Sequence, residues 1–360
     1  MSCLTLGRCA LSVCASAILL AACGGSQSAA LSPRSMTNAI TNGARPLGYG
    51  PLDASIMVQR PGAAHPDHHR SWVSPDAKRA KQILFVSDRG HDDVYMYSLP
   101  QMKLIGTLTG FSDPAYMCSD TKGNVYLANP VSAQVFRISH AGLITAKYED
   151  LYGYPVGCGY DAATGHLAVT NVYDFSGPGQ VLVFDSANPS KPPTVLSNPN
   201  QYYYNFVGYD PKSILWVSGR DVFGNYMVSS CGPSSCGNVY LYDGTLYYPG
   251  AVQWNPLSNN WVLFDQECGD EYAACSYPVL AGDILGAPTI YKNYEGGSVC
   301  DMAQGVLDSK ATFVAGADYE FCANASSSFS RWPYAAGGTP TKYRTTDAYS
   351  VPVGAAISTR

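Results

Sequence analysis

The stretch that decides the fold is Pro155-Val-Gly-Cys-Gly-Tyr-Asp161, followed by a short turn and then by His166-Leu-Ala-Val-Thr-Asn171. This pattern is typical of two antiparallel strands joined by a tight turn. The second strand of the unit recurs along the chain, and successive copies begin roughly 40 to 50 residues apart, which is the usual spacing of β-propeller blades. The six copies are Ile83–Asp88, Asn124–Asn129, His166–Asn171, Ile214–Gly219, Asn260–Asp265 and Ala311–Gly316.

A single four-stranded blade cannot bury both of its faces, so successive blades must stack face to face around an axis. Both faces of each sheet then lie in the core, which explains why the second strands are almost continuous apolar runs. No long stretch has a helical period, and the 35 Gly and 24 Pro residues fit a chain of many turns. The sequence therefore predicts an all-β fold, a six-bladed β-propeller of four-stranded antiparallel blades with very little helix.

The turns between the first and second strands begin with Asp or Asn, as in Asp120-Thr-Lys-Gly123 and Asp210-Pro-Lys-Ser213. A carboxylate or amide at this position accepts backbone N–H groups, and Gly or Asn takes the left-handed position that closes the turn. These acidic residues are therefore interpreted as structural and not as catalytic.

Third and fourth strands follow each second strand. In the fourth blade the pattern places them at Asn238–Asp243 and Thr245–Tyr248, which leaves a long loop at residues 220–237. Boundaries in the fifth and sixth blades are less regular.

The first blade has no inner strand before Ile83. The C-terminal Ser350–Ser358 matches the inner-strand pattern and has no second strand after it. We therefore expect this segment to insert beside Ile83–Asp88 and to close the ring without leaving an open sheet edge.

The order of strand, Asp-x-x-Gly turn, hydrophobic strand ending in Asp or Asn, and third strand resembles the NHL-repeat and SMP-30/gluconolactonase-like six-bladed propellers. Gly123-Asn-Val-Tyr-Leu-Ala-Asn129 shows this pattern, and the resemblance covers about residues 80 to 358. It implies the fold but no single activity, because such propellers include scaffolds, ligand-binding modules, lactonases and lyases.

The first 22 residues combine Arg8 with the apolar run Ala10–Ala22, which is too short for a membrane span and is typical of a signal peptide. Leu20-Ala-Ala-Cys23 resembles the bacterial lipobox, which implies that Cys23 is lipidated and becomes the mature N-terminus. Gly24 stands where inner-membrane retention signals carry Asp, so the outer membrane or cell surface is favoured. An ordinary signal peptide cut before an unmodified Cys23 is the alternative.

We expect three segments: a signal peptide at 1–22, a lipidated cysteine with a flexible tether at 23–75, and the propeller at 76–360. The formal net charge is −5 and no basic stripe is visible, so nucleic acid is not an expected partner. The expected partners are a lipid bilayer, reached through the acyl anchor, and an unknown protein, peptide or glycan ligand. The propeller is expected to be monomeric.

Eight cysteines remain in the exported chain if Cys23 carries lipid, and an even number in an exported protein predicts disulfides. None of them shows Cys-x-x-Cys spacing, so a metal site is not favoured. Cys118 and Cys158 lie in neighbouring inner strands, where buried core thiols are one use for them, and the sequence leaves their state open. The predicted pairs are Cys231 with Cys236, Cys268 with Cys275, and Cys300 with Cys322.

Loops that enter the first strands and loops that leave the second strands emerge on the same face of a propeller, and long loops there favour binding. The entering loops carry many tyrosines, whose apolar rings and polar hydroxyls suit sugars, peptides or protein partners. Packing between blades is the alternative use of each tyrosine. The candidate ligand-binding residues on this face are Asp88, Arg89, His91, Asn129, Tyr154, Asn171, Tyr203, Arg220, Asp221, Tyr248 and Asp265.

Four of these residues, Asp88, Asn129, Asn171 and Asp265, end second strands. The resemblance to SMP-30-like enzymes implies an alternative in which they are oxygen ligands of a divalent cation near the channel mouth. The inner strands supply no Glu to complete such a site, so we interpret the four as hydrogen-bonding partners of their own loops. No cofactor is predicted.

The sequence places no Ser-His-Asp set on one face, and His91 is the main candidate for a catalytic base there. We therefore predict no catalytic residues and expect a non-catalytic ligand- or protein-binding propeller. A metal-dependent hydrolase of the SMP-30 type and a structural cell-surface protein are the alternatives.

Overall fold

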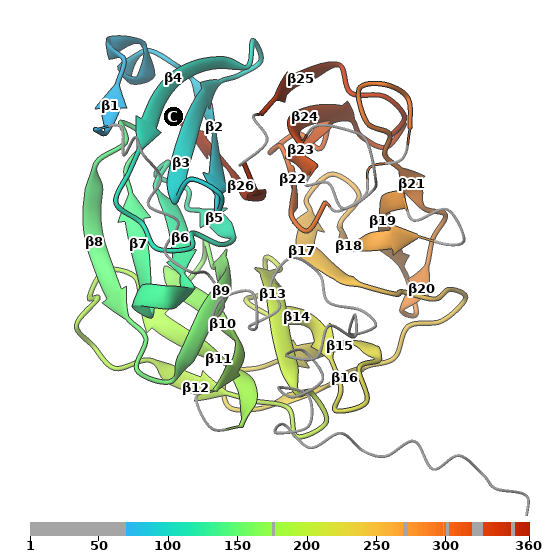
Figure 1. The fold of residues 1–360 in the computed structure, drawn as a ribbon. Coiled ribbons are helices and arrows are strands. Elements are labelled where there is room, and N and C mark those ends of the chain that lie inside the picture. The colour runs from blue at the N-terminus through green and yellow to red at the C-terminus, as the bar shows by residue number, and fades with distance from the viewer. Residues whose placement is uncertain are drawn as a thin grey trace, which may run out of the picture.

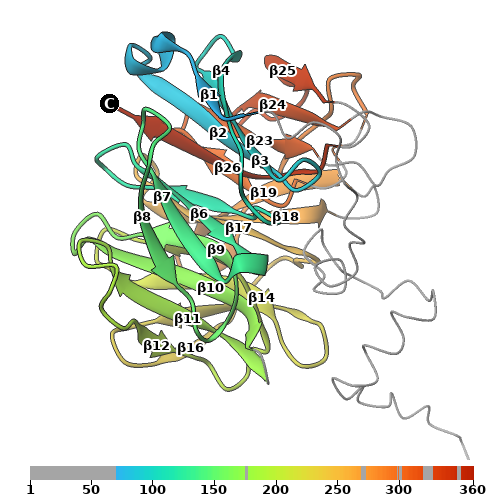
Figure 2. The same ribbon diagram turned by 60° about the vertical axis from the view of Figure 1, so that its left-hand side comes forward.

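The computed structural model describes residues 70–174, 177–268, 273–297, 299, 302–318, 327–346 and 350–360. They form six antiparallel sheets arranged around a common axis (Figure 1). The turned view shows these sheets following one another around the molecule (Figure 2). The predicted all-β, six-bladed propeller is confirmed. The expected signal peptide, Cys23, nearly all of the tether and the Cys300–Cys322 pair lie outside the described residues.

Each blade runs from an inner strand beside the axis to an outer strand at the rim. The first blade contains β26 (Pro352–Thr359), β2 (Gln82–Asp88), β3 (Asp93–Ser98), β4 (Lys103–Leu108) and β1 (Trp72–Val73). The second contains β5 (Met117–Ser119), β6 (Val125–Asn129), β7 (Gln134–Ile138) and β8 (Ile144–Glu149), and the third β9 (Gly153–Tyr160), β10 (His166–Asp174), β11 (Pro178–Asp185) and β12 (Thr194–Leu196).

The fourth blade contains β13 (Tyr203–Tyr209), β14 (Leu215–Arg220), β15 (Tyr226–Cys231) and β16 (Cys236–Val239). The fifth contains β17 (Pro249–Asn255), β18 (Asn260–Cys268), β19 (Ala273–Leu280), β20 (Ile284–Leu285) and β21 (Thr289–Ile290), and the sixth β22 (Gly305–Leu307), β23 (Phe313–Asp318), β24 (Ser328–Pro333) and β25 (Lys342–Thr345). Among the described residues, helix is limited to η1 (Pro75–Lys78) and η2 (Pro130–Ser132), and neither is long or apolar enough to cross a membrane.

Strand β2 shows why the second strands are apolar on both sides. Ile83 and Phe85 pack against residues of the second blade, whereas Leu84 and Val86 point to the other face and pack against the sixth blade. All four side chains are 0% exposed. Burial of each such side chain contributes about 1.5 to 3 kcal/mol, so the stacking of blades is the main source of stability.

The predicted structural role of the turn acids is confirmed. Asp120 Oδ1 accepts the backbone N–H groups of Lys122 (2.9 Å) and Asn124 (2.8 Å), which closes the turn between β5 and β6. Asp210 Oδ1 makes the same two contacts, both at 2.8 Å, with the residues two and four positions further on. These bonds fix the hairpins that join inner and second strands.

The fourth blade differs from the prediction. Its third and fourth strands are β15 and β16, not 238–243 and 245–248, so residues 220–237 are two short hairpins and not one long loop. Asp221 begins the first hairpin, because its Oδ1 accepts the N–H groups of Phe223 (2.8 Å) and Asn225 (2.9 Å). The Asp-x-x-Gly-Asn pattern at 221–225 is the same turn signal that begins at Asp120. The predicted strand boundaries of the fourth blade did not take the signal at 221–225 into account.

Closure of the ring by the C-terminal strand is confirmed. β26 pairs antiparallel with β2 along its whole length, from Gln82 opposite Thr359 to Asp88 opposite Pro352. The far edge of the same sheet gains β1, in which Trp72 lies opposite Thr107 of β4. The first sheet therefore contains both ends of the described chain.

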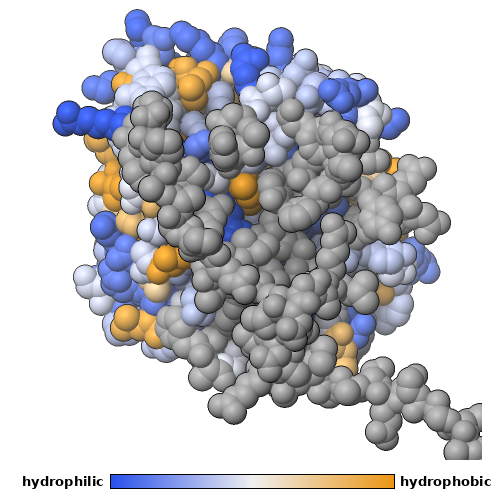
Figure 3. All heavy atoms as spheres, viewed as in Figure 1, coloured by the Kyte–Doolittle hydropathy of each residue, from blue (hydrophilic) through white to orange (hydrophobic). Residues whose placement is uncertain are grey.

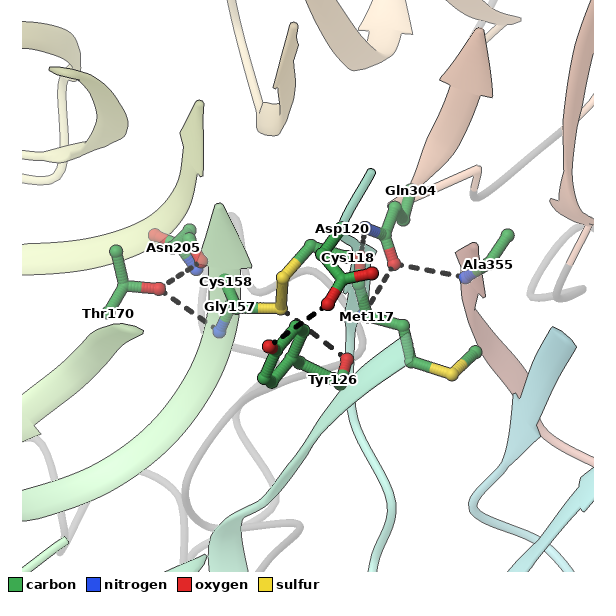
Figure 4. The surroundings of a disulfide bond; sticks show 10 residues. All are labelled: Met117, Cys118, Asp120, Tyr126, Gly157, Cys158, Thr170, Asn205, Gln304 and Ala355. Carbon is green, nitrogen blue, oxygen red and sulfur yellow. Dashed lines mark hydrogen bonds between the residues drawn. A yellow bond between two sulfur atoms is a disulfide. The ribbon is translucent and has the colours of Figure 1, made fainter. Parts of the chain in front are cut away.

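The axis of the propeller is filled by side chains. Tyr116, just before β5 of the second blade, and Phe206, in β13 of the fourth blade, lie with ring centroids 4.1 Å apart and are 1% and 3% exposed. Gln304 Oε1 accepts the N–H groups of Met117 and Ala355, each at 3.0 Å, and its Nε2 donates to the Met117 carbonyl at 2.5 Å (Figure 4). One side chain of the sixth blade thus ties the inner strands of the first and second blades together.

Cys118 and Cys158, whose state the sequence left open, are not free core thiols, because they form a disulfide between the inner strands β5 and β9 (Figure 4). The two strands belong to different blades, and how closely neighbouring inner strands approach cannot be judged from the sequence. A cross-link that closes a loop of this length restricts the unfolded chain and contributes about 4 kcal/mol in the chain-entropy model. The predicted pairs Cys231–Cys236 and Cys268–Cys275 are confirmed.

His140 lies at the seam between the first two blades. Its Nδ1 is 2.7 Å from the Ser358 hydroxyl of β26, and its Nε2 is 2.9 Å from the Ala80 carbonyl oxygen. Burial lowers the pKa of His140 below its usual value of 6.5, the charge of Arg360 acts in the same direction, and the bond to Ala80 opposes the shift. The folded protein therefore favours the neutral ring.

The stability of the propeller is expected to depend on the titration of His140. The unfolded chain binds a proton near pH 6.5 more readily than the folded one, so the contribution is fully present above that pH and is lost as the pH falls below it. Thermal melting of wild type and His140→Gln between pH 8 and 5 measures this effect. The wild type should lose more stability on acidification than the variant, and parallel pH profiles would contradict the assignment.

Candidate functional site

The loops that leave the second strands and those that enter the inner strands open onto one face, which we call the loop face. Figure 3 views the molecule from this side and shows hydrophobic residues in several separate patches around its visible margin. The exposed apolar side chains in described loops of this face include Leu151, Val222 and Phe223, of which Phe223 is 78% exposed. Ser71 lies at the same end of the first blade, because its hydroxyl is 3.1 Å from the Thr109 hydroxyl.

Asp88 is 0% exposed and ends β2. Its Oδ1 accepts the N–H groups of Gly90 (2.8 Å) and Val351 (2.7 Å), and its Oδ2 accepts the Ser350 hydroxyl (2.5 Å) and lies 3.0 Å from His91 Nδ1. The carboxylate thus fixes its own loop and the loop that enters β26. The predicted neighbours Asp88 and His91 are in contact.

The same arrangement recurs in other blades. Asp265 in β18 of the fifth blade accepts the N–H groups of Tyr247 (2.7 Å) and Tyr248 (2.8 Å), which lie just before the inner strand β17. Asn129 Oδ1 accepts the N–H of Ser112, before β5, at 3.0 Å. In the third blade, Asn171 Nδ2 donates to Asp150 Oδ1 at 3.3 Å, before β9. All four residues therefore hydrogen-bond the loop that enters the inner strand of their blade, and Asp88 and Asn129 also bond residues of their own loop, Gly90 and Ser132.

These bonds determine which side-chain oxygens of the four residues remain available to a metal ion. The oxygens of Asp88 and Asp265 already accept backbone N–H groups, whereas Asn171 Oδ1 is buried and has no hydrogen-bond partner. Within the described ranges, no group of three or more His, Cys, Asp or Glu side chains is placed to hold a metal ion.

Arg89 was predicted as a ligand-binding residue, but its side chain is 1% exposed and lies inside the protein. Its Nε and Nη2 donate to the two carboxylate oxygens of Asp113 at 2.6 and 2.8 Å. A buried bidentate pair of this kind fixes the geometry of the loop between the first two blades. The sequence could not reveal it, because Asp113 lies 24 residues away in a different loop.

Arg220 and Tyr248 are brought together. The Arg220 guanidinium lies over the Tyr248 ring at 4.7 Å from its centroid, and Tyr203 is directly opposite Arg220 in the β13–β14 ladder. All three side chains are half-buried. The Asp265 carboxylate accepts the backbone N–H of Tyr248. We call Tyr203, Arg220 and Tyr248 the Tyr/Arg cluster.

Tyr226 lies directly opposite Arg220 in the β14–β15 ladder. Burial, followed by the negative charge of Asp265, raises its pKa, while Arg220 acts in the opposite direction. The phenol therefore stays neutral at physiological pH, and it supplies an uncharged hydroxyl to its surroundings.

The remaining rim tyrosines are used in different ways. Tyr154 is half-buried and packs against the core, so it presents part of its ring to the loop face. Tyr204 is 0% exposed and its hydroxyl accepts the Asn198 N–H at 2.6 Å, which is a structural role. Tyr152 and Tyr247 are 36% and 47% exposed.

A pocket that the sequence did not predict lies between the fourth and fifth blades. After β16 the chain crosses at residues 240–248 to the fifth blade, where Tyr242 forms a bridge with Ile284 of β20. The crossing leaves a space of about 600 Å³ lined by residues 224–228, 238–241 and 244–247 and by Leu285. Because 238–248 had been interpreted as two strands, no cavity was expected there.

No family model matches the chain, and no curated protein matches it. Several solved structures are similar to this chain in fold. A chain in the crystal structure of a nidogen/laminin complex is 12% identical with a TM-score of 0.59, covering 77% of this chain and 98% of that one. A protein of unknown function from Bacteroides caccae is 11% identical with a TM-score of 0.58, covering 78% and 99%. At these identities the likeness establishes that the chain shares the six-bladed propeller fold with these proteins.

Proposed function

We propose that this protein is a lipid-anchored protein of the bacterial cell envelope whose propeller is a non-catalytic ligand- or protein-binding module. The contact surface in this proposal is the Tyr/Arg cluster with the neighbouring tip at Phe223. The observation that carries it is the Arg220 guanidinium on the Tyr248 ring, in a loop that Asp265 holds by two backbone hydrogen bonds.

Two physical arguments support a binding role for the cluster. Tyr and Arg residues supply a large share of the affinity in protein interfaces, because each combines apolar area with directional hydrogen bonding. The loops that carry them are fixed before binding, by Asp265 for Tyr248 and by the Asp221 turn for Phe223, so little conformational entropy is lost when a partner docks.

The comparison with solved structures also supports a binding role. One similar chain was solved in a complex of nidogen and laminin, so a propeller of this shape occurs in a protein–protein assembly. We also propose that the chain is related to NHL-repeat and SMP-30-like propellers, because it carries the strand-turn-strand motif around Gly123–Asn129.

The binding proposal predicts a ligand that depends on the Tyr/Arg cluster. On a glycan and peptide array, Arg220→Ala and Tyr248→Ala should each weaken the leading hits about tenfold or more, because a preformed cation–π pair is lost. Arg331→Ala is the matched control, since Arg331 lies over the Phe313 ring at 4.1 Å in the sixth blade. Tyr154→Ala and Tyr203→Ala test how far the surface extends.

Other results would favour one of the two alternative functions, a structural cell-surface protein or a metal-dependent hydrolase. Hits that are indifferent to these substitutions, or no hits, would favour the structural cell-surface protein. Calorimetry with calcium, zinc and manganese and a lactone-hydrolysis screen test the metal-dependent hydrolase. Tight ion binding with turnover, abolished in Asp265→Asn, would establish that activity instead.

The proposed anchor predicts that Cys23→Ala releases the protein from the membrane fraction. The acyl chain is attached at Cys23 in this proposal, and the propeller itself has no described helix able to span a bilayer. Fractionation with labelled fatty acid measures both release and lipid incorporation. Equal labelling of variant and wild type would rule out Cys23 as the attachment site.

A further inference from the structure

We propose that the pocket between the fourth and fifth blades binds a neutral oligosaccharide. The inference rests on the proposed binding function and gives it a ligand class. The pocket adjoins the Tyr/Arg cluster, because Tyr247 in its wall precedes Tyr248 in the chain and Tyr226, which also lines it, lies directly opposite Arg220 in the β14–β15 ladder. Its volume of about 600 Å³ is in the range of small-molecule sites and is enough for two or three sugar rings.

The lining gives a charged group no opposite charge with which to pair. Of the described residues that line the pocket, none is Asp, Glu, Lys, Arg or His. An ionised group placed there would lose part of its hydration without gaining an opposite charge, which is unfavourable. A neutral ligand suffers no such loss.

The lining also favours a ligand with both apolar faces and hydroxyl groups. Its floor contains aliphatic side chains such as Val228 and Leu285, whereas its mouth carries Tyr240 and Tyr247, which are 66% and 47% exposed. Tyrosine combines an apolar ring with a polar hydroxyl. A sugar ring matches this arrangement, because its C–H face is apolar and its edge hydroxyls donate and accept hydrogen bonds.

The walls of the pocket are held in place before any ligand arrives. Asn238 Nδ2 donates to the Tyr240 hydroxyl at 3.2 Å, and Asp265 accepts the Tyr247 N–H at 2.7 Å. The Cys231–Cys236 disulfide joins the ends of β15 and β16, which supply the floor. Such preorganisation reduces the entropy lost on binding, which matters for weakly bound sugars.

Gly244 shows how closely the crossing segment lies on the fifth blade. A Cβ atom at this position would be 2.8 Å from Leu285 Cδ1, so the backbone of residue 244 rests directly on a lining side chain. The pocket wall is therefore packed against the blade and does not stand away from it.

The test is isothermal titration of the purified propeller with the neutral tetrasaccharides maltotetraose, cellotetraose, xylotetraose and chitotetraose, and with the anionic tetragalacturonate. At least one neutral tetrasaccharide should bind, and tetragalacturonate should bind at least tenfold more weakly. Tyr240→Ala and Tyr247→Ala should each raise the dissociation constant of the bound sugar about tenfold, since each removes a stacking ring.

Tyr242→Ala is the matched control. Tyr242 lies between the two test residues on the same crossing segment and is 57% exposed, but it is not among the residues that line the pocket. Its loss should change affinity less than twofold. Melting temperatures verify that all three variants are folded.

Hydrogen exchange of the wild type keeps the test independent of any variant. The bound sugar should protect residues 238–248 and leave the third blade unchanged. No binding by any neutral tetrasaccharide, equal binding of tetragalacturonate, or protection elsewhere would overturn the inference. If array ligands that depend on Arg220 are still found, the saccharide pocket fails while the binding function stands; if neither is found, both fail.

Discussion

A chain that ends at residue 349 should lose most of its free energy of unfolding, on the order of 5 to 15 kcal/mol for a domain of this kind. The deletion removes β26, in which Val353, Ala355, Ala356 and Ile357 are at most 7% exposed and pack against both neighbouring blades. It also leaves β2 without its inner partner, which creates an open sheet edge at the axis. Circular dichroism and urea denaturation should detect an unfolded or aggregated chain.

A second truncation provides the control, because the first sheet carries a terminal strand at each edge. A chain starting at residue 74 loses β1, but Trp72 and Val73 are 44% and 36% exposed, so the expected loss is only about 1 kcal/mol. Addition of a peptide spanning 350–360 to the C-terminal truncation should restore folded signal. Equal stability of the two truncated chains would contradict closure by β26.

The architecture was predictable because the same strand-turn-strand unit repeats along the chain. Each second strand carries the same apolar run, and turns such as the one at Asp120 mark the hairpins with a local chemistry that needs no tertiary information. The orphan segment Ser350–Ser358 could be paired with Ile83–Asp88 by elimination. The third and fourth strands of the fourth blade were predicted wrongly because Asn238–Asp243 has a strand-like pattern. The actual third strand, β15, follows the turn at Asp221, which was not recognised as a turn.

The candidate site was predictable only in part. Asp88 and Asn129 end their second strands as expected, whereas β10 and β18 continue beyond Asn171 and Asp265. The contacts of Asp88 with His91 and of Arg220 with Tyr248 bring predicted residues together. Partners from other blades were not predictable. The burial of Arg89, the Cys118–Cys158 disulfide and the pocket all depend on how blades approach one another, which local sequence does not encode.

Gln304→Ala is expected to cost about 3 to 5 kcal/mol, the largest effect of any single substitution that we predict. Three buried backbone groups, the N–H and C=O of Met117 and the N–H of Ala355, would lose their partner at the axis. Each unsatisfied buried group costs about 1 to 3 kcal/mol, and the three are not fully additive. Urea denaturation of the purified variant measures the loss.

Gln304→Met separates hydrogen bonding from packing, since methionine keeps most of the side-chain volume but none of the polar contacts. It should be nearly as destabilising as Gln304→Ala. Gln253→Ala is the matched control: Gln253 also bonds the backbone of a neighbouring blade, at Gly305 O and Leu307 N, but it is half-buried. Water can replace these contacts, so about 1 kcal/mol is expected. A Gln304→Met variant as stable as wild type would show that the axis is held by packing alone and that the link between three blades is dispensable.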